Sequence, residues 1–141
     1  MTIPRGYERL AKVLEDALEQ SASGKGKERH ANDLAFENQP MQSITAMVGY
    51  GFPLGQVMKK TQEAGGMLSR SEYDHARAEL LGVIVYAAGA IVALDREAEA
   101  EKRLRVQREA ARLNMASYDL RSCTEVGLTI EEVEWIRNNN K

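Results

Sequence analysis

Basic residues concentrate in the segment GKGKERH, residues 24–30, which contributes Lys25, Lys27, Arg29 and His30. Its two glycines free backbone N–H groups to point at phosphate oxygens, while the cations add charge and His30 adds a donor that titrates near neutral pH. The G-x-x-x-x-G-K-[ST] spacing of a Walker A loop is absent. The segment therefore predicts a phosphate site that is not a P-loop, and the alternative is a solvated linker.

A second glycine- and lysine-containing segment, GYGFPLGQVMKK, occupies residues 49–60. A helix that opens near Pro53 would present free N–H groups to an anion, and Lys59 and Lys60 would lie on that helix. Tyr50 and Phe52 could stack on a base. One short helix separates the two segments, so they could meet in space; the alternative is a plain helix–helix turn with two surface lysines.

An acidic set follows in EYDHARAE, where Glu72, His75 and Glu79 fall on one face of a helix. Glu-x-x-His is half of the motif of di-metal carboxylate bundles, and the second copy is absent, so no metal or other cofactor is predicted. Glu79 stands where the helix changes from polar to apolar. There it could accept hydrogen bonds from a base or ribose, or serve as an ordinary paired acid.

Catalysis has little support in this sequence. Cys123 falls on an apolar helical stripe, and no serine occupies a nucleophile elbow. Glu131 and Glu134 have the Glu-x-x-Glu spacing of all-helical nucleotide pyrophosphatases, but the matching Glu-x-x-Asp helix is absent. The same terminal helix opens with three acidic residues, which would repel the phosphates of duplex DNA. Duplex DNA is therefore not the expected partner.

The elements that must position these residues are all predicted to be helices. Helical spacing after Pro4 puts Tyr7, Leu10, Ala11, Leu14, Ala17 and Leu18 on one face and Arg9, Lys12, Glu15, Asp16 and Glu19 outward. A long polar loop, residues 21–39, carries the first basic segment; loops of that length are usually functional or disordered. Pro40 and Pro53 begin the next two helices, and Gly65 and Gly66 end the second of them.

A capping box, Ser69 with Glu72, predicts the start of one long helix over residues 70–114. A short helical pair over residues 118–141 contains a second box, Thr129 with Glu132, and a staple of Leu128 with Val133. The prediction is an all-α, compact helical bundle around one long central helix. Residues 1–117 form its main domain, and residues 118–141 form the C-terminal pair.

Residues 80–94 of the long helix are apolar on every face, which demands burial all round. A membrane span needs roughly 18 or more such residues, so the run is interpreted as a buried helix rather than a membrane segment. Short partner helices cannot cover all of it, and we expect a second copy of the chain to cover the rest in a homo-oligomer. Residues 95–113 form a charged arm.

Composition sets further bounds. The 141 residues carry a net charge of −2, with 43% apolar and 28% charged residues, so nothing draws the whole chain to nucleic acid or membrane. One cysteine excludes an intramolecular disulfide and fits a cytoplasmic protein. The N-terminal ten residues lack the apolar core of a signal peptide.

The segments GKGKERHANDLAFENQPMQSI, GYGFPLGQVMKK and AELLGVIVYAAGAIVAL together resemble a group of small bacteriophage proteins of unassigned activity. The resemblance covers about residues 24–95 and rests on a GKGxERHA start, a GxxxGQxxKK middle and an AELLGxxxY helix. It implies a phage accessory protein in the host cytoplasm. It places weight on Lys27, Arg29, His30, Gln56, Lys59, Lys60 and Glu79.

The leading expectation is a non-enzymatic binder that sequesters a nucleotide or other phosphorylated small molecule, as a counter-defence protein would. Lys25, Lys27, Arg29, His30, Lys59 and Lys60 would hold phosphate. One alternative is an all-α, metal-dependent nucleotide hydrolase using Glu72, His75 and Glu79. Another is an interaction module that inhibits a host protein through the charged arm.

Overall fold

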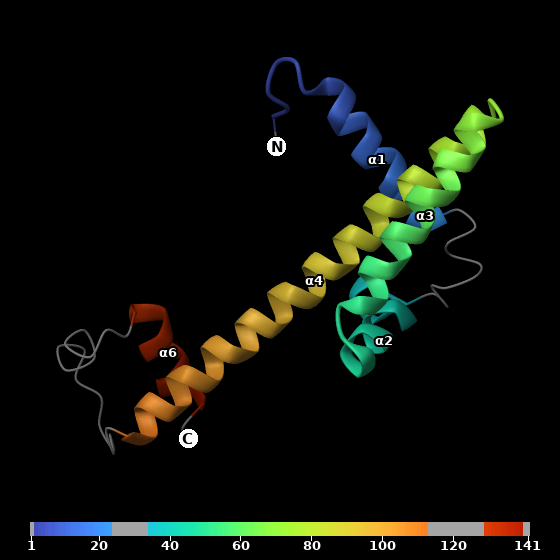
Figure 1. The fold of residues 1–141 in the computed structure, drawn as a ribbon. Coiled ribbons are helices and arrows are strands. Elements are labelled where there is room, and N and C mark those ends of the chain that lie inside the picture. Colours follow the sequence, from blue (N-terminus) through green and yellow to red (C-terminus); the bar gives the residue numbers. More distant parts are fainter. Residues whose placement is uncertain (1, 24–33, 113–128, 140–141) are drawn as a thin grey trace. The chain divides into compact units, whose positions relative to one another are not determined.

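The computed structural model describes residues 2–23, 34–112 and 129–139, and these residues contain helices and turns but no strand. The prediction of an all-α protein around one long helix is confirmed. The elements are α1 (Glu8–Ser23), the 3-10 helix η2 (Phe36–Asn38), α2 (Pro40–Val48), α3 (Gly51–Ser69), α4 (Tyr73–Arg112) and α6 (Ile130–Asn139), as Figure 1 shows.

The chain divides into two compact units, residues 1–94 and 95–141, and the boundary lies inside α4. The sequence placed it after residue 117, at the end of the long helix. The structural division follows packing instead, because the first part of α4 contacts the preceding helices and the second part contacts α6. The helix predicted over residues 118–127, with Cys123, lies outside the described residues, as does Leu128 of the predicted staple.

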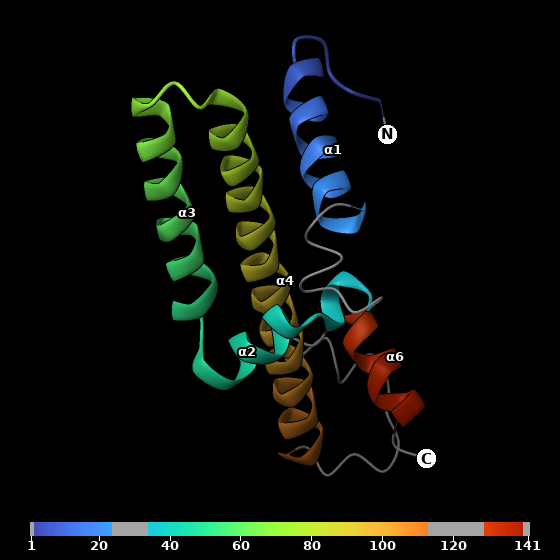
Figure 2. The same cartoon turned by 90° about the vertical axis from the view of Figure 1, so that its right-hand side faces the viewer.

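In the first unit, α3 and α4 form an antiparallel hairpin, which is plain in Figure 2. The end of α1 reaches α4, where the Gln20 amide donates to the carbonyl oxygen of Ala78 at 3.1 Å. Helix α2 crosses α4 about three turns further along, where the buried Gln42 amide donates to the carbonyl oxygen of Gly89 at 3.1 Å. The hairpin is therefore the scaffold on which α1 and α2 are placed.

Two predicted helix ends are wrong. Helix α1 begins at Glu8 and not at Pro4, since Gly6 turns the chain at φ 88° and its N–H binds the Glu8 carboxylate. Helix α3 runs through Gly65 and Gly66 to Ser69. Glycine in a helix costs about 1 kcal/mol; the neighbouring Ala64 is almost fully buried, so packing outweighs that cost.

The turn between α3 and α4 is a Schellman motif rather than the predicted capping box. The Glu72 N–H binds the Met67 carbonyl oxygen and the Ser71 N–H binds that of Leu68, both at 3.0 Å. Ser71 takes the left-handed position at φ 61°. The Ser69 hydroxyl bonds back to Gly65 within α3, so it is not available to cap α4.

The core of the first unit is built from small side chains. Ala17, Ala64, Ala76, Leu81 and Pro53 are buried. Close approach is tightest at two glycines of α4: a Cβ atom on Gly89 would lie 2.6 Å from Cε of Met41, and one on Gly82 would lie 3.0 Å from the Lys60 stem. Glycines at these two positions therefore let α2 and α3 approach α4 closely.

A single chain leaves part of the apolar run 80–94 exposed, as expected from the short helices that pack against it. Leu81 and the two glycines are buried, but Leu80, Ile91 and Leu94 are 43%, 57% and 54% exposed. Among the described helices, α4 is the one that is long and apolar enough to cross a membrane, by length and composition alone. Only 17% of its most apolar stretch of 18 residues is buried. The protein thus presents an apolar stretch of α4 with much of its surface uncovered.

The predicted apolar face of α1 is also largely uncovered. Ala17 packs inward, yet Leu10, Leu14 and Leu18 are half or more exposed. Helix α1 meets α4 mainly through its C-terminal half, at Asp16 and Gln20, and within the described part of the chain its N-terminal half is exposed. These uncovered side chains belong to the same unit as the uncovered face of α4.

The second unit contains α4 from Asp95 onward and α6. The capping box is confirmed: the Glu132 carboxylate accepts from the Thr129 N–H at 2.8 Å, and the Thr129 hydroxyl accepts from the Glu132 N–H at 3.3 Å. Glu132 also pairs with Arg105, beside the buried Val106. One acid thus both caps α6 and links it to α4.

Candidate functional site

The basic segment of the predicted phosphate site lies outside the described residues, so its arrangement stays a prediction. This segment contributes Lys25, Lys27, Arg29 and His30. The described residues nearest in sequence are Ser23, the last residue of α1, and Leu34 before η2. The loop predicted over residues 21–39 is thus shorter than expected at both ends, because α1 extends through Ser23 and η2 occupies Phe36–Asn38.

Two residues of the predicted site, Lys60 and Glu79, contact each other. The Lys60 ammonium lies 2.7 Å from the Glu79 carboxylate, and about a quarter of each side chain is exposed. The stem of Lys60 lies over Gly82. This pair joins α3 to α4, so the lysine charge is compensated within the fold and Glu79 already has a cationic partner.

The remaining predicted residues lie at the N-cap of α3 and along its first half. Phe52 packs edge-on against Tyr86 of α4, with ring centroids 6.3 Å apart and an interplanar angle of 80°. Tyr50 precedes α3 and is half-buried, as is Gln56. Lys59 is exposed and lies 3.6 Å from Glu63, one turn along the same helix. The aromatic ring predicted to stack on a base is therefore part of the α3–α4 contact.

The acidic set also has partners. Arg70 donates to the Glu72 carboxylate at 2.7 Å, and this bond lowers the pKa of Glu72 below its ordinary value. Glu79 is held by Lys60, and His75 is exposed. Within the described ranges, no three histidine, cysteine or acidic side chains cluster as metal ligands. The geometry gives the hydrolase alternative no structural support.

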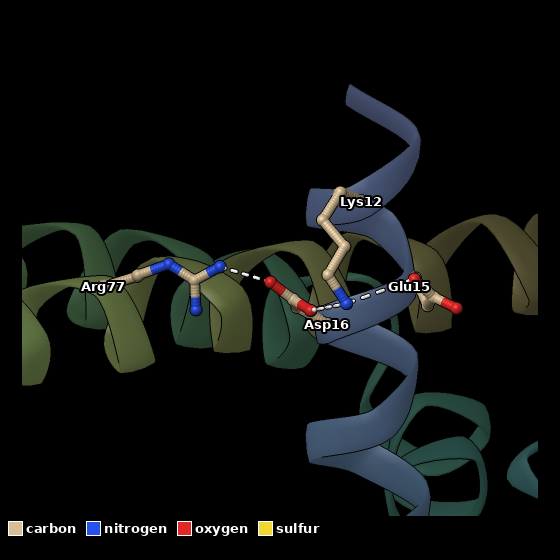
Figure 3. A network of polar contacts seen from close by, with 4 residues as sticks. All are labelled: Lys12, Glu15, Asp16 and Arg77. Carbon is tan, nitrogen blue, oxygen red and sulfur yellow. Dashed lines mark hydrogen bonds and ion pairs between the residues drawn. The ribbon is translucent and has the colours of Figure 1, made fainter. Parts of the chain in front are cut away.

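A polar network that the sequence did not predict lies where α1 crosses α4 (Figure 3). Asp16 accepts from Arg77 of α4 and from Lys12 of its own helix, the latter at 3.0 Å. Lys12 also lies 3.2 Å from Glu15. The two cations, Lys12 first, lower the pKa of Asp16, while Asp16 and Glu15 raise the pKa of Lys12.

Beside this network is an open pocket of about 370 Å³, lined by Asp16, Glu19, Gln20, Ser23, Arg77 and Leu81. The volume is within the range of small-molecule sites. Sequence spacing had placed Asp16 and Glu19 on the outward face of α1. Helical spacing shows which residues share a face but not which distant residue lies opposite that face. The one sequence feature that pointed to the network was the excess of charged residues on the outward face of α1.

A smaller pocket, of about 230 Å³, lies in the second unit between α4 and α6, lined by Glu99, Lys102, Arg103, Val106, Glu131, Glu132 and Trp135. Its charges are of both signs, and Arg103 already pairs with Glu99 at 3.7 Å. Nothing in this pocket selects one class of ligand.

Comparison of the chain with models of protein families, with curated proteins and with solved structures found no match. The resemblance to small bacteriophage proteins therefore stays a prediction.

Proposed function

We propose that this protein is a non-enzymatic binder of a nucleotide or other phosphorylated small molecule. The observation that carries the proposal is the pocket between α1 and α4. Ser23 lines it, and Ser23 is followed directly in the chain by GKGKERH. Arg77 supplies one guanidinium to that pocket, and three more cations, Lys25, Lys27 and Arg29, follow Ser23 closely in the sequence.

The partners of the helix cations narrow the set of phosphate-binding residues. Lys60 is held by Glu79 and Arg70 by Glu72. A phosphate would have to compete with these carboxylates, so the proposal rests on Lys25, Lys27, Arg29 and His30, with Lys59 in a lesser role. The guanidinium of Arg29 and the ammonium of Lys27 suit phosphate oxygens through charge-assisted hydrogen bonds.

The first test is thermal unfolding of the full chain against a panel of nucleotides and cyclic nucleotides, with and without magnesium. A ligand at 100 times its Kd stabilises the folded state by about 2.7 kcal/mol, or roughly 9 °C for a chain of this size. We expect this shift to be lost in Lys27→Ala and Arg29→Ala. The matched control is Arg9→Ala, which removes an exposed cation of α1 outside the pocket.

The outcomes separate the functional classes. A shift with intact ligand recovered afterwards supports the binder, whereas magnesium-dependent turnover would establish the hydrolase. No shift across the panel would overturn the proposal. The charged second half of α4, with residues 95–113, would then be tested as a surface that inhibits a host enzyme.

We further propose that the protein acts as a cytoplasmic homo-oligomer, encoded by a phage and working inside its host. The support for assembly is the uncovered apolar surface: Leu10, Leu14 and Leu18 on α1, and Ile91 and Leu94 on α4, are each half or more exposed. Exposed apolar surface of that extent marks an interaction site, and closed symmetric assembly is the commonest way to cover it.

Light scattering at several protein concentrations tests the assembly. We expect a mass that is a multiple of the chain mass, and Leu14→Asp should shift it towards the monomer without unfolding the chain. A monomer at high concentration would refute the oligomer. A monomer that also binds neutral phosphatidylcholine vesicles would assign the apolar surface of α4 to lipid instead.

A further inference from the structure

The pocket between α1 and α4 contains hydrogen-bonding groups of opposite kinds on neighbouring walls. Arg77 offers donors from α4, and the exposed Glu19 carboxylate offers acceptors from α1, with the buried Leu81 as an apolar wall. A bare phosphate would be attracted by Arg77 and repelled by the acids of α1. The lining therefore suits a ligand that presents both acceptors and N–H donors.

Arg77 is held in place for such a role. One of its terminal nitrogens donates to Asp16, and Asp16 is held in turn by Lys12 (Figure 3). A guanidinium carries five N–H donors, so most of the fork remains for a ligand. Half of the Arg77 side chain is exposed, and this exposure leaves the fork accessible.

Among the common bases, guanine matches this pair of groups. Its O6 and N7 are the acceptors that arginine contacts in a bidentate manner. Its N1–H and N2–H groups are donors that suit a carboxylate. Adenine presents an amino donor beside N7 and has no N1–H, so it would leave both Arg77 and Glu19 incompletely paired. The guanine ring would lie against Leu81.

We propose that this pocket reads a guanine base, with Arg77 on its O6/N7 edge and Glu19 on its N1–H/N2–H edge. The proposal rests on the nucleotide-binding function proposed above and names the base that the site selects. The guanine nucleotide would be bound by its base between α1 and α4, beside the residue that precedes the basic segment.

Calorimetric titration with matched pairs of probes tests the proposal: GTP against ATP, and cyclic di-GMP against cyclic di-AMP, without magnesium. A good bidentate contact discriminates against the wrong base by roughly tenfold to a hundredfold, and we expect the guanine member to be tighter by that factor. Glu19→Gln should remove most of the preference, chiefly by weakening the binding of the guanine probe. Arg77→Lys, which keeps the charge but not the fork, should do the same.

The controls keep this test apart from the test of the proposed function. Glu15→Gln changes a carboxylate of the same helix that does not line the pocket, and it should keep the preference. Because Arg77 also holds Asp16, circular dichroism melts of Arg77→Lys are compared with those of Glu19→Gln, whose residue is exposed. Equal binding of guanine and adenine probes would overturn the guanine inference and leave the nucleotide binder intact. No binding of any probe would overturn both.

Discussion

The contact between Gly89 and Met41 makes a sharp prediction about how α2 packs on α4. In Gly89→Ala the new methyl group would lie 2.6 Å from Cε and 2.7 Å from Sδ of Met41, and both distances are too short to persist. The Gln42 amide, which donates to the Gly89 carbonyl oxygen, lies 3.6 Å from the same position. The substitution must therefore displace the flexible end of the half-buried Met41 side chain.

The matched control is Gly65→Ala in the middle of α3, where nothing lies within 4 Å of an added Cβ atom. Both substitutions gain about 0.5–1 kcal/mol of helix stability. Only Gly89→Ala also displaces the end of the Met41 side chain, and because that side chain is flexible the cost lies at the low end of the about 1–3 kcal/mol of overpacking. We expect Gly65→Ala to be more stable than Gly89→Ala, with a difference of about 1 kcal/mol between the two variants.

Urea unfolding followed by circular dichroism at 222 nm measures this difference. Removing the Met41 side chain should relieve the contact with the new methyl group, so Met41→Ala should lose less stability in the Gly89→Ala background than in the natural one. Additive effects of Met41→Ala and Gly89→Ala would refute the packing argument, because neighbouring residues that share a contact must couple. Equal stability of the two glycine variants would refute it as well.

Three further predictions concern the polar contacts. Thr129→Ala should cost about 0.5–2 kcal/mol and reduce the helicity of α6, seen by hydrogen exchange, whereas loss elsewhere in the chain would contradict the role of this cap. In the folded state the pKa values of Asp16 and Glu132 are lowered, that of Glu132 mainly by the Thr129 N–H. The stability that these carboxylates contribute is full above the pKa of the unfolded chain, near about 4, and is lost as the pH falls through the folded pKa. Melting temperatures measured at a series of acidic pH values should therefore decline in that range. Lys60→Met should cost about 1 kcal/mol by leaving Glu79 unpaired. It should leave nucleotide affinity unchanged, and a large loss of affinity would return Lys60 to the ligand site.

Several features of this protein were predictable from local sequence. The long helix was expected over residues 70–114 and occupies Tyr73–Arg112, because no breaker other than single glycines interrupts it. The Thr129–Glu132 box was expected and is formed, since both groups that bond lie within one helical turn. The capping box predicted at Ser69 did not form, although its residues fit the motif equally well. Helix α3 continued through Ser69, and the turn that follows places Ser71 in the left-handed position.

The candidate site was less predictable than the fold. Lys60 and Glu79 were chosen for their positions on two helices, and the antiparallel hairpin turned them towards each other rather than towards a ligand. Phe52 was chosen as a stacking residue and contacts Tyr86. In each case the partner lies 19 or more positions away, and helical spacing within one segment could not identify it.

Helix formation, the Thr129–Glu132 cap and the apolar faces were set by the sequence itself, since these depend on interactions within about one or two turns. The tertiary structure alone decided that Asp16 of α1 and Arg77 of α4, 61 positions apart, would meet and border a pocket. It also decided that the apolar face of α1 would remain largely uncovered in one chain. The physical reason is that a helical pattern specifies which side chains share a face, whereas the path of the chain between helices determines what that face contacts.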